Sequence, residues 1–381
     1  MPPKRSHALV VTRNLPPLVG GMERLIWHIV EAIAGTHEVH VVGPEGSAKR
    51  LPEGVTASEV PLKPMPLFLL RAAWASLVSA LRLRPTFVLA GSGLTAPIVW
   101  LAARLSGARA IVYLHGLDVE TRHWLYRLLW RPLFRRFDLV IVNSHFTRDL
   151  ALEAKVPAER IRIIHPGVEL PEISKKAEAR DAFRSHFGLG EAPLMLYVGR
   201  ITPRKGLTKF VDDILPRVLN ARPDAKLAVI GDEPHGALLK AAHGERSRAE
   251  EALANRKISS SVTFLGELAQ NDPVLTEAYF SSEVMIFPVQ DRPGDNEGFG
   301  MVAIEAAAHG LPTVAFAVGG VPDAVSEGIS GKLIPSGDND AFSDAVIGYL
   351  VKPNDLKSRP FAEKFSWTEF KIKLDRELKS I

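Results

Sequence analysis

The 381-residue sequence contains no cysteine. This absence excludes a disulfide framework, a thiol nucleophile and any cysteine-ligated zinc or iron–sulfur site, and it is compatible with the cytoplasm. Aromatic residues supply only 7% of the chain, and the 29 glycines and 28 prolines are too few for a collagen-like or low-complexity protein. Hydrophobic residues make up 46% and charged residues 24%, as in soluble globular proteins, and the length favours two domains.

Long hydrophobic runs are also scarce. The first apolar run, residues 8–11, is too short for the core of a signal peptide. Residues 86–103 carry no charge and reach the lower limit for a membrane span. Gly91, Gly93 and Pro97 divide this segment into a strand, a turn and a helix, so we expect no transmembrane helix there.

Acidic residues are missing from one long stretch. None occurs between Glu59 and Asp118, whereas six cations do: Lys63, Arg71, Arg82, Arg84, Arg104 and Arg109. Residues 1–170 contain 21 Lys and Arg against 13 Asp and Glu, and the remainder contains 26 against 30. This asymmetry predicts that the N-terminal half presents a basic surface to an anionic partner.

Short β-rich runs alternate with helical patterns along the chain, which predicts an α/β fold of doubly wound parallel sheets. The predicted strands are residues 7–11, 39–42, 87–90, 110–114, 139–142, 161–164, 194–198, 227–230, 262–265, 284–287 and 313–316. Residues 165–172 interrupt the rhythm and are typical of a linker. We therefore predict two Rossmann-like domains, with the ligand site in the cleft between them.

Two candidate site motifs fall in the first domain. Gly20 and Gly21 follow the first strand and open a helix, where backbone N–H groups can approach a phosphate. His115 directly follows an apolar strand and can offer a hydrogen bond to a substrate hydroxyl. Each feature also has an ordinary structural explanation, a helix-opening turn or a buried histidine.

Two further motifs fall in the second domain. Arg200 and Lys205 lie in one turn after residues 194–198, and such a pair suits a diphosphate. Glu297 precedes a predicted apolar helix that contains Glu305, a costly position for a carboxylate unless it has a partner. The N–H groups of Phe299, Gly300 and Met301 open the same helix and are suited to phosphate or sugar oxygens.

In order and spacing, these motifs resemble those of the family-4 retaining glycosyltransferases. The match consists of Gly-Gly-x-Glu-Arg, His-Gly-x-Asp, Gly-Arg-x4-Lys-Gly and Glu-x7-Glu, and it covers nearly the whole chain. The resemblance implies the GT-B architecture, two facing Rossmann-like domains. It implies an acceptor-binding domain over residues 1–167, a nucleotide-sugar-binding domain over 174–358, and a C-terminal helix within 359–381 that crosses back to the first domain.

The resemblance also implies roles for single residues. Arg200 and Lys205 would bind the donor's diphosphate and stabilise the charge that develops as it leaves. Glu297 would hold hydroxyls of the donor sugar, and Glu305 those of the ribose. His115 would contact the sugar or orient the acceptor. Gly20, Gly21, Gly231, Leu265 and the backbone of residues 299–301 would line the donor site. The nucleotide-sugar is a co-substrate, no protein nucleophile is required, and no cofactor is expected.

Asp338-Asn339-Asp340 is a candidate metal site, because it matches the Asp-x-Asp pair of metal-dependent transferases with another architecture. The string follows a Pro-Ser-Gly turn and precedes a helical pattern, so helix capping explains it better. We predict no essential metal.

A basic and aromatic segment, residues 122–137, predicts contact with an anionic membrane. It contains five arginines and no acid, interleaved with Trp124, Tyr126, Trp130, Phe134 and Phe137. The predicted membrane and acceptor surface comprises Arg122, Trp124, Arg127, Trp130, Arg131, Arg135 and Arg136. The alternative is a core-packed helix with arginines that reach the solvent. Nothing else in the sequence supports nucleic-acid binding.

The sequence and its resemblance to this family together predict a cytoplasmic enzyme, peripheral on the inner membrane face, that transfers a hexose to a glycan or lipid-linked acceptor. The resemblance implies retained configuration and favours GDP-mannose or UDP-glucose as the donor. The enzyme's product would enter cell-envelope polysaccharide or glycolipid. Two alternatives stay open at this stage: a sugar-nucleotide epimerase or phosphorylase on the same architecture, and a non-catalytic sugar-binding protein.

Overall fold

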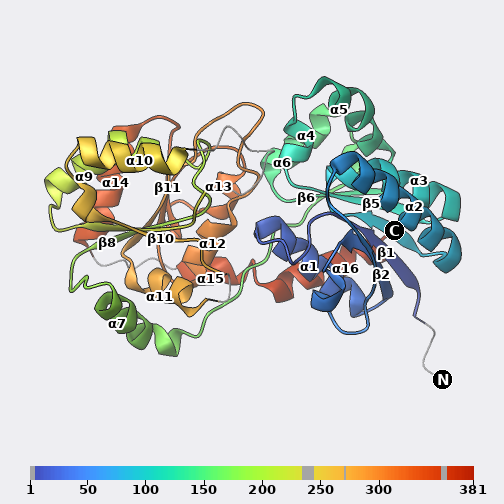
Figure 1. Ribbon diagram of the computed structural model, residues 1–381, viewed down its shortest axis with the longest axis horizontal. Coiled ribbons are helices and arrows are strands. Elements are labelled where there is room, and N and C mark those ends of the chain that lie inside the picture. Colours follow the sequence, from blue (N-terminus) through green and yellow to red (C-terminus); the bar gives the residue numbers. More distant parts are fainter. Residues whose placement is uncertain (1–4, 234–243, 270–271, 353–357) are drawn as a thin grey trace. The chain divides into compact units, whose positions relative to one another are not determined.

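The computed structural model describes residues 5–233, 244–269, 272–352 and 358–381. It divides into two compact units: Met1–Gly167 with Trp367–Ile381, and Val168–Ser366. Each unit is a parallel sheet covered by helices on both faces (Figure 1). The chain re-enters the first unit at Trp367, later than residue 359, because α15 (Ser358–Glu363) still packs on α12 (Met301–Ala308) of the second unit.

The first unit contains a seven-stranded parallel sheet in the order β3-β2-β1-β4-β5-β6-β7. Its strands are β1 (His7–Val11), β2 (Glu38–Pro44), β3 (Thr56–Val60), β4 (Phe87–Ala90), β5 (Arg109–Leu114), β6 (Leu139–Val142) and β7 (Ile161–Ile163). Its helices are α1 (Gly21–Ala34), α2 (Met65–Leu83), α3 (Ala96–Ser106), α4 (Leu117–Glu120), α5 (Trp124–Leu129), α6 (His145–Glu153) and α16 (Trp367–Lys379), with 3-10 turns η1 (Ala48–Arg50), η2 (Gly93–Thr95), η3 (Arg131–Arg136) and η4 (Ala158–Arg160).

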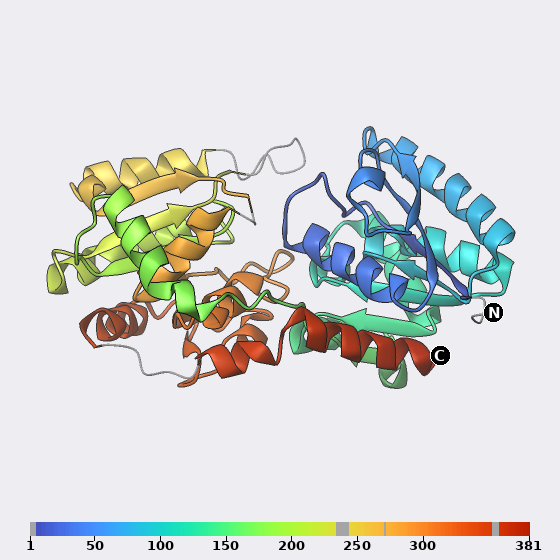
Figure 2. The ribbon, with the colours of Figure 1, turned by 90° about the horizontal axis from the view of Figure 1, so that it is seen from below.

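Strand alternation divides the core of this unit into two layers. Leu9 and Val11 of β1 pack with α2 and α3, whereas Ala8 and Val10 pack with α1 and α16. Figure 2 shows α16 beside α1 on one side of the sheet. Because both faces are covered, the central strands are apolar throughout, which is typical of parallel sheets.

The second unit contains a six-stranded parallel sheet in the order β10-β9-β8-β11-β12-β13. Its strands are β8 (Leu194–Val198), β9 (Lys226–Ile230), β10 (Val262–Gly266), β11 (Val284–Phe287), β12 (Thr313–Phe316) and β13 (Gly331–Ile334). Its helices, besides α12 and α15, are α7 (Lys176–His186), α8 (Leu207–Lys209), α9 (Leu215–Ala221), α10 (Glu245–Asn255), α11 (Pro273–Ser281), α13 (Val321–Ala324) and α14 (Asn339–Val351), with short turns η5 (Ile173–Lys175), η6 (Phe210–Ile214, a π-helical segment) and η8 (Ser259–Ser261).

The predicted α/β class and parallel sheets are confirmed. Residues 86–103 form a strand, a turn and the start of a helix, as expected. β3 and β13 were not predicted, because they are edge strands that contain exposed polar residues and therefore lack a continuous apolar run. Met22, whose spacing places it with the apolar residues of α1, is exposed and lies in the first turn of that helix.

Candidate active site

A buried cluster of charges lies in the loops that follow β8 and β11. Arg204 Nη1 donates to Glu297 Oε2 at 2.5 Å, and Lys205 Nζ lies 2.9 Å from the same oxygen. The three side chains are only 11–14% exposed. The structure thus brings together Lys205 and Glu297, two of the predicted site residues. The other cation that pairs with Glu297 is Arg204, which was not predicted. The predicted Arg200 is exposed.

The electrostatics of this cluster follow from its burial. Burial alone would raise the pKa of Glu297, but the charges of Lys205, Arg204 and Arg200 outweigh it and hold the pKa at about 2. Burial lowers the pKa of Lys205, against the attraction of Glu297. The Glu297 carboxylate raises the pKa of Arg204, which also faces Asp295 at 3.3 Å. The Glu297 carboxylate is therefore ionised at neutral pH, between the side chains of Arg204 and Lys205.

Glycines let these loops pass close to one another. A Cβ at Gly206 would lie 2.0 Å from the carbonyl oxygen of Pro288, and Gly206 has a φ of 75°. A Cβ at Gly231, whose φ is 130°, would lie 2.0 Å from the carbonyl oxygen of Gly199. Gly231 N–H also donates to Gly266 O at 2.7 Å. The carboxyl ends of β8, β9 and β10 therefore meet backbone to backbone, at the edge where parallel sheets bind ligands.

Glu305 has the partner that its position in the apolar helix α12 requires. The hydroxyl of Tyr279 donates to Glu305 Oε2 at 3.0 Å. Tyr279 stacks on His309 with ring centres 4.7 Å apart, and His309 Nδ1 lies 2.7 Å from the Glu305 carbonyl oxygen. Burial lowers the pKa of His309 to about 4, so this ring is neutral and supports Glu305 by packing and hydrogen bonding.

The other predicted donor-site residues occupy different environments. The Phe299 side chain is buried in the core, so only its backbone can reach a ligand. Gly300 is the N-cap of α12 and has a φ of 100°, and Met301 is partly exposed in the first turn. Leu265 is half-buried at the end of β10 and packs against the second core layer of this unit.

In the first unit, polar residues collect at the carboxyl ends of neighbouring strands. His115 is buried after β5, and its Nε2 lies 2.8 Å from the carbonyl oxygen of Gly91, which follows β4. Asn143, after β6, donates to the His115 carbonyl oxygen at 3.4 Å. The Ser92 hydroxyl is buried and has no hydrogen-bond partner among the described residues. His115 was predicted from the sequence. Ser92 and Asn143 were not, and their only signal was a position within two residues of the end of an apolar strand.

Gly20 and Gly21 are exposed at the start of α1, as predicted. The Gly20 N-cap position has a φ of 157°, and a Cβ there would lie 2.4 Å from Glu23 Oε2. Glu23 in turn accepts a hydrogen bond from Asn14 Nδ2 at 3.0 Å. The Glu23 carboxylate therefore lies against Gly20 at the start of the helix, where a side chain at position 20 would collide with it.

The segment of residues 122–137 combines features of both predictions made for it. It forms α5 and then η3, because Pro132 cannot continue an α-helix. Phe134 and Phe137 are fully buried, and Tyr126 is largely covered, since they pack on the sheet and not outward. Of the predicted surface, Trp130 and Arg131 are partly buried, and the Trp130 Nε1–H donates to Leu94 O at 3.0 Å; the exposed residues are Arg122, Trp124, Arg127, Arg135 and Arg136.

The Asp338-Asn339-Asp340 string caps a helix, as predicted. Asp338 accepts a hydrogen bond from the N–H of Ala341 at 3.0 Å and is the N-cap of α14. Asp340 pairs with Arg217 at 2.6 Å on the surface. Both carboxylates therefore have structural partners in the second unit.

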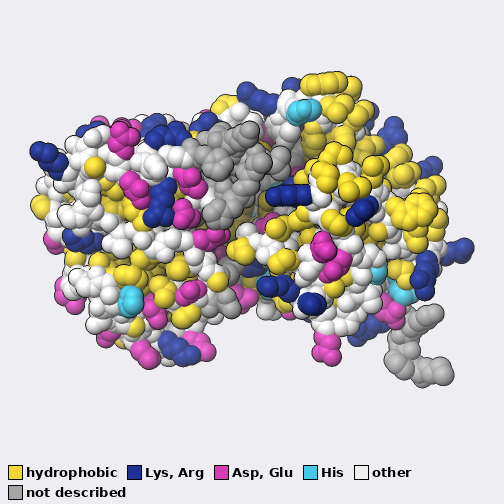
Figure 3. All heavy atoms as spheres, viewed as in Figure 1, with side chains coloured by type: hydrophobic (Ala, Val, Ile, Leu, Met, Phe, Trp, Pro, Cys, Tyr) yellow, Lys and Arg dark blue, Asp and Glu magenta, His cyan; other side chains and the backbone are white. Residues whose placement is uncertain are grey.

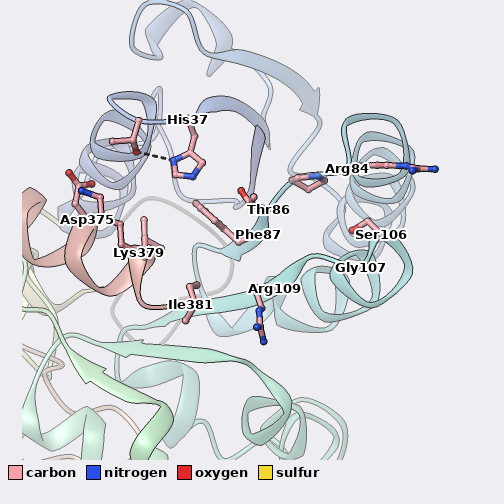
Figure 4. A pocket seen from close by; sticks show the side chains of 13 residues that line it. His37, Arg84, Thr86, Phe87, Ser106, Gly107, Arg109, Asp375, Lys379 and Ile381 are labelled. Carbon is pink, nitrogen blue, oxygen red and sulfur yellow. Dashed lines mark hydrogen bonds between the residues drawn. The ribbon is translucent and has the colours of Figure 1, made fainter. Parts of the chain in front are cut away.

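A cavity of about 560 Å³ lies in the first unit, away from every predicted site residue (Figure 4). Thr86, Phe87 and Arg109 line it at the amino ends of β4 and β5, and Asp375 and Lys379 of α16 close one side. It therefore lies at the opposite edge of the sheet from His115.

Among the described residues, α2 is the one helix whose length and hydropathy would suffice to cross a membrane.

Two glycosyltransferase family models match this chain, one in each half. Residues 192–352 match the family model "Glycosyl transferases group 1", and residues 19–172 match "Glycosyltransferase Family 4". A GDP-mannose-dependent alpha-(1-6)-phosphatidylinositol monomannoside mannosyltransferase of Mycolicibacterium smegmatis is 29% identical over 91% of this chain and 89% of its own length. A D-inositol 3-phosphate glycosyltransferase of the same species is 34% identical over 60% of this chain and 50% of its own length.

Solved structures show the same fold. The crystal structure of HepE from Anabaena in complex with UDP superimposes with a TM-score of 0.78 at 19% identity, covering 98% of this chain and 100% of that one. The two sheets and their helices are therefore those of a known two-domain architecture.

Proposed function

The chain is a family-4 glycosyltransferase with the GT-B fold, and on that premise we propose that it transfers mannose from GDP-mannose to a lipid-linked acceptor with retention of configuration. The choice of donor and acceptor is supported by the phosphatidylinositol monomannoside mannosyltransferase, which aligns over 91% of this chain. The product would enter a glycolipid or polysaccharide of the cell envelope.

The observation that carries the proposal is the buried cluster of Lys205, Arg204 and Glu297. Two cations converge on one carboxylate oxygen in a crowded, glycine-lined edge of the second sheet. A diphosphate bound at this edge would receive the ammonium of Lys205 and the guanidinium of the exposed Arg200. Glu297 would then hold hydroxyls of the sugar, and Glu305, oriented by Tyr279, those of the ribose.

The proposed reaction needs no protein nucleophile. The bond between the anomeric carbon and the diphosphate oxygen breaks while the acceptor hydroxyl oxygen bonds to the same face of that carbon. The leaving phosphate oxygen accepts the hydroxyl proton. Lys205 and Arg200 stabilise the negative charge that grows on the diphosphate, and we propose that they do so without a metal ion or another cofactor.

We also propose that the enzyme works at the inner face of the cytoplasmic membrane as a peripheral protein, since a lipid-linked acceptor is held there. The exposed residues Arg122, Trp124, Arg127, Arg135 and Arg136 contribute cations and one aromatic ring to the surface of the first unit.

The test is a panel of nucleotide-sugars in a thermal-shift assay, followed by transfer to phosphoinositol glycolipids in detergent. GDP-mannose should raise Tm more than UDP-glucose does, because a bound donor stabilises the fold by mass action. NMR of the product should show the anomeric configuration of the donor, and activity should persist in EDTA. A larger shift with UDP-glucose would refute the donor, and an inverted product would refute the mechanism.

A further inference from the structure

Helix α2 is apolar on two opposite faces. One face, in the core of the first unit, is fully buried and consists of Phe68, Ala72, Ser76 and Ala80. The opposite face is exposed and consists of Leu70 (70% exposed), Trp74 (71%), Val78 (45%) and Leu81 (52%). At about 100° per residue, these four side chains fall within roughly 80° of one another and form one continuous stripe. A helix on a water-facing surface normally carries polar residues there, so this stripe requires an explanation.

The neighbouring helix α3 extends the apolar surface. It packs against α2 on the same side of the sheet, and its Leu101 and Leu105 are 46% and 54% exposed. In Figure 3, hydrophobic side chains gather over the region that holds α2, α3 and α5 in Figure 1. We call the exposed residues of α2 and α3 the α2–α3 face.

Cations border this face and acids are absent from it. Arg71 and Arg82 lie on one flank of the α2 stripe, about 20–40° beyond its edge, and both are exposed. Arg104 is exposed on α3, and Arg84 directly follows α2. No Asp or Glu occurs in residues 60–117, which include both helices.

We propose that the α2–α3 face binds the surface of an anionic lipid bilayer, with α2 lying parallel to the membrane plane. An exposed tryptophan and leucines bordered by arginines match the boundary between acyl chains and anionic headgroups. The inference rests on the proposed function in one respect, the lipid-linked acceptor that would bring the enzyme to a membrane.

Two other arrangements fit the face less well. If α2 crossed the bilayer, Phe68, Ala72 and Ala80 would have to leave the core of the first unit, where they are fully buried. If a second copy of the chain covered the face in a symmetric dimer, arginines would meet arginines with no carboxylate between them.

The experiment measures flotation of the full chain with vesicles of phosphatidylcholine, with or without phosphatidylglycerol, at low salt. Two variants test the face: Leu70→Ser/Trp74→Ser/Leu81→Ser removes apolar contact, and Arg71→Gln/Arg82→Gln removes charge. Their matched controls in the second unit alter side chains of similar exposure, Ile329→Ser/Val351→Ser and Lys332→Gln/Lys352→Gln.

The wild-type chain should float with the anionic vesicles and not with the neutral ones. The charge variant should bind them about thirtyfold more weakly, from the contribution of about two cations near an anionic surface. The apolar variant should lose about tenfold or more. Both control variants should bind like the wild type, and all variants should keep the wild-type Tm because the changed side chains are exposed.

Four results would overturn the proposal. The wild type could bind both kinds of vesicle equally or neither kind. Face variants could bind as the wild type does. Loss could instead follow only from Arg127→Gln/Arg135→Gln, in the segment of residues 122–137. Finally, sedimentation could show a wild-type dimer that the apolar variant converts to a monomer, which would assign the face to a second copy.

A donor measurement separates this inference from the proposed function. The thermal shift by GDP-mannose should be the same for the wild type and both face variants, since the face lies in the other unit from the Lys205 cluster. If the wild type floats but GDP-mannose gives no shift, the donor assignment fails and the membrane face stands. If GDP-mannose gives the shift and the wild type does not float, the membrane face fails and the donor assignment stands.

Discussion

Replacement of Glu297 by glutamine should destabilise the protein by about 3 kcal/mol at pH 7. The magnitude follows from the pKa of this carboxyl, which falls from 4.5 to about 2 in the folded chain; each pKa unit corresponds to about 1.4 kcal/mol. Glutamine keeps the size of the side chain and an acceptor oxygen, but it leaves the buried ammonium of Lys205 without a counter-charge.

The pH dependence of this loss identifies its cause. Because the folded pKa is depressed, ionised Glu297 contributes its full stability above about pH 4.5 and loses it as the pH falls through about 2. The wild-type advantage over Glu297→Gln should therefore shrink to about 1.4 kcal/mol near pH 3.

Urea denaturation of both proteins at pH 7, 4 and 3 measures the difference, with the exposed Glu251→Gln as a control that should change stability little at any pH. A difference that stays constant from pH 7 to pH 3 would refute the reasoning, since it would come from packing and not from the ionised pair. If the free energies of unfolding of the two proteins differed by less than about 1 kcal/mol at pH 7, the cluster of Arg204, Lys205 and Glu297 would be solvated.

Further changes test other parts of the site. Lys205→Met should lower kcat about 10²–10³-fold in the mannosyl-transfer assay, whereas the exposed Lys209→Met should leave it unchanged. Tyr279→Phe removes one hydrogen bond to the second glutamate of the Glu-x7-Glu motif, and should cost about 1 kcal/mol in urea denaturation and raise the donor KM; an unchanged KM would count against the ribose role. Gly231→Ala should abolish donor binding by calorimetry, because its Cβ would meet a backbone oxygen of the β8 loop at 2.0 Å. Asp338→Ala removes a helix cap and should cost about 1 kcal/mol, with transfer activity still insensitive to EDTA.

The sheets could be predicted from the sequence because their strands are short, continuous apolar runs. The bounds of β4, β6, β8, β11 and β12 were predicted to the residue, since every residue of these strands is buried and each forms a continuous run rich in apolar side chains. Edge strands follow no such rule. In β3 only Val60 is buried and the other four side chains are partly or fully exposed, so the sequence is equally compatible with a loop.

The surface could be predicted less well, because periodicity does not show which side of a segment faces the core. The arginines of residues 122–137 drew attention to that segment, but Phe134 and Phe137 complete the core beneath it. The exposure of the apolar outer stripe of α2 was not predicted, because its residues are apolar. An apolar helix is ordinarily a buried one, and only the structure shows that Trp74 and Leu70 lie on the side facing away from the sheet.

The pairing of Glu297 with Arg204 and Lys205 could not be predicted from the spacing of these residues in the sequence. Arg200, Arg204 and Lys205 share one turn, and the sequence gives no reason to prefer one guanidinium over the other as the partner of a carboxylate more than ninety residues away. The fold decides it through the backbone: Glu297 O accepts the N–H of Gly320 at 2.8 Å, and Gly206 lies against Pro288. These contacts fix both loops, so that Arg204 and Lys205 meet Glu297 while Arg200 stays exposed. Three cations against Glu297 and Asp295 leave the loop positively charged, which favours an arriving diphosphate over a neutral sugar.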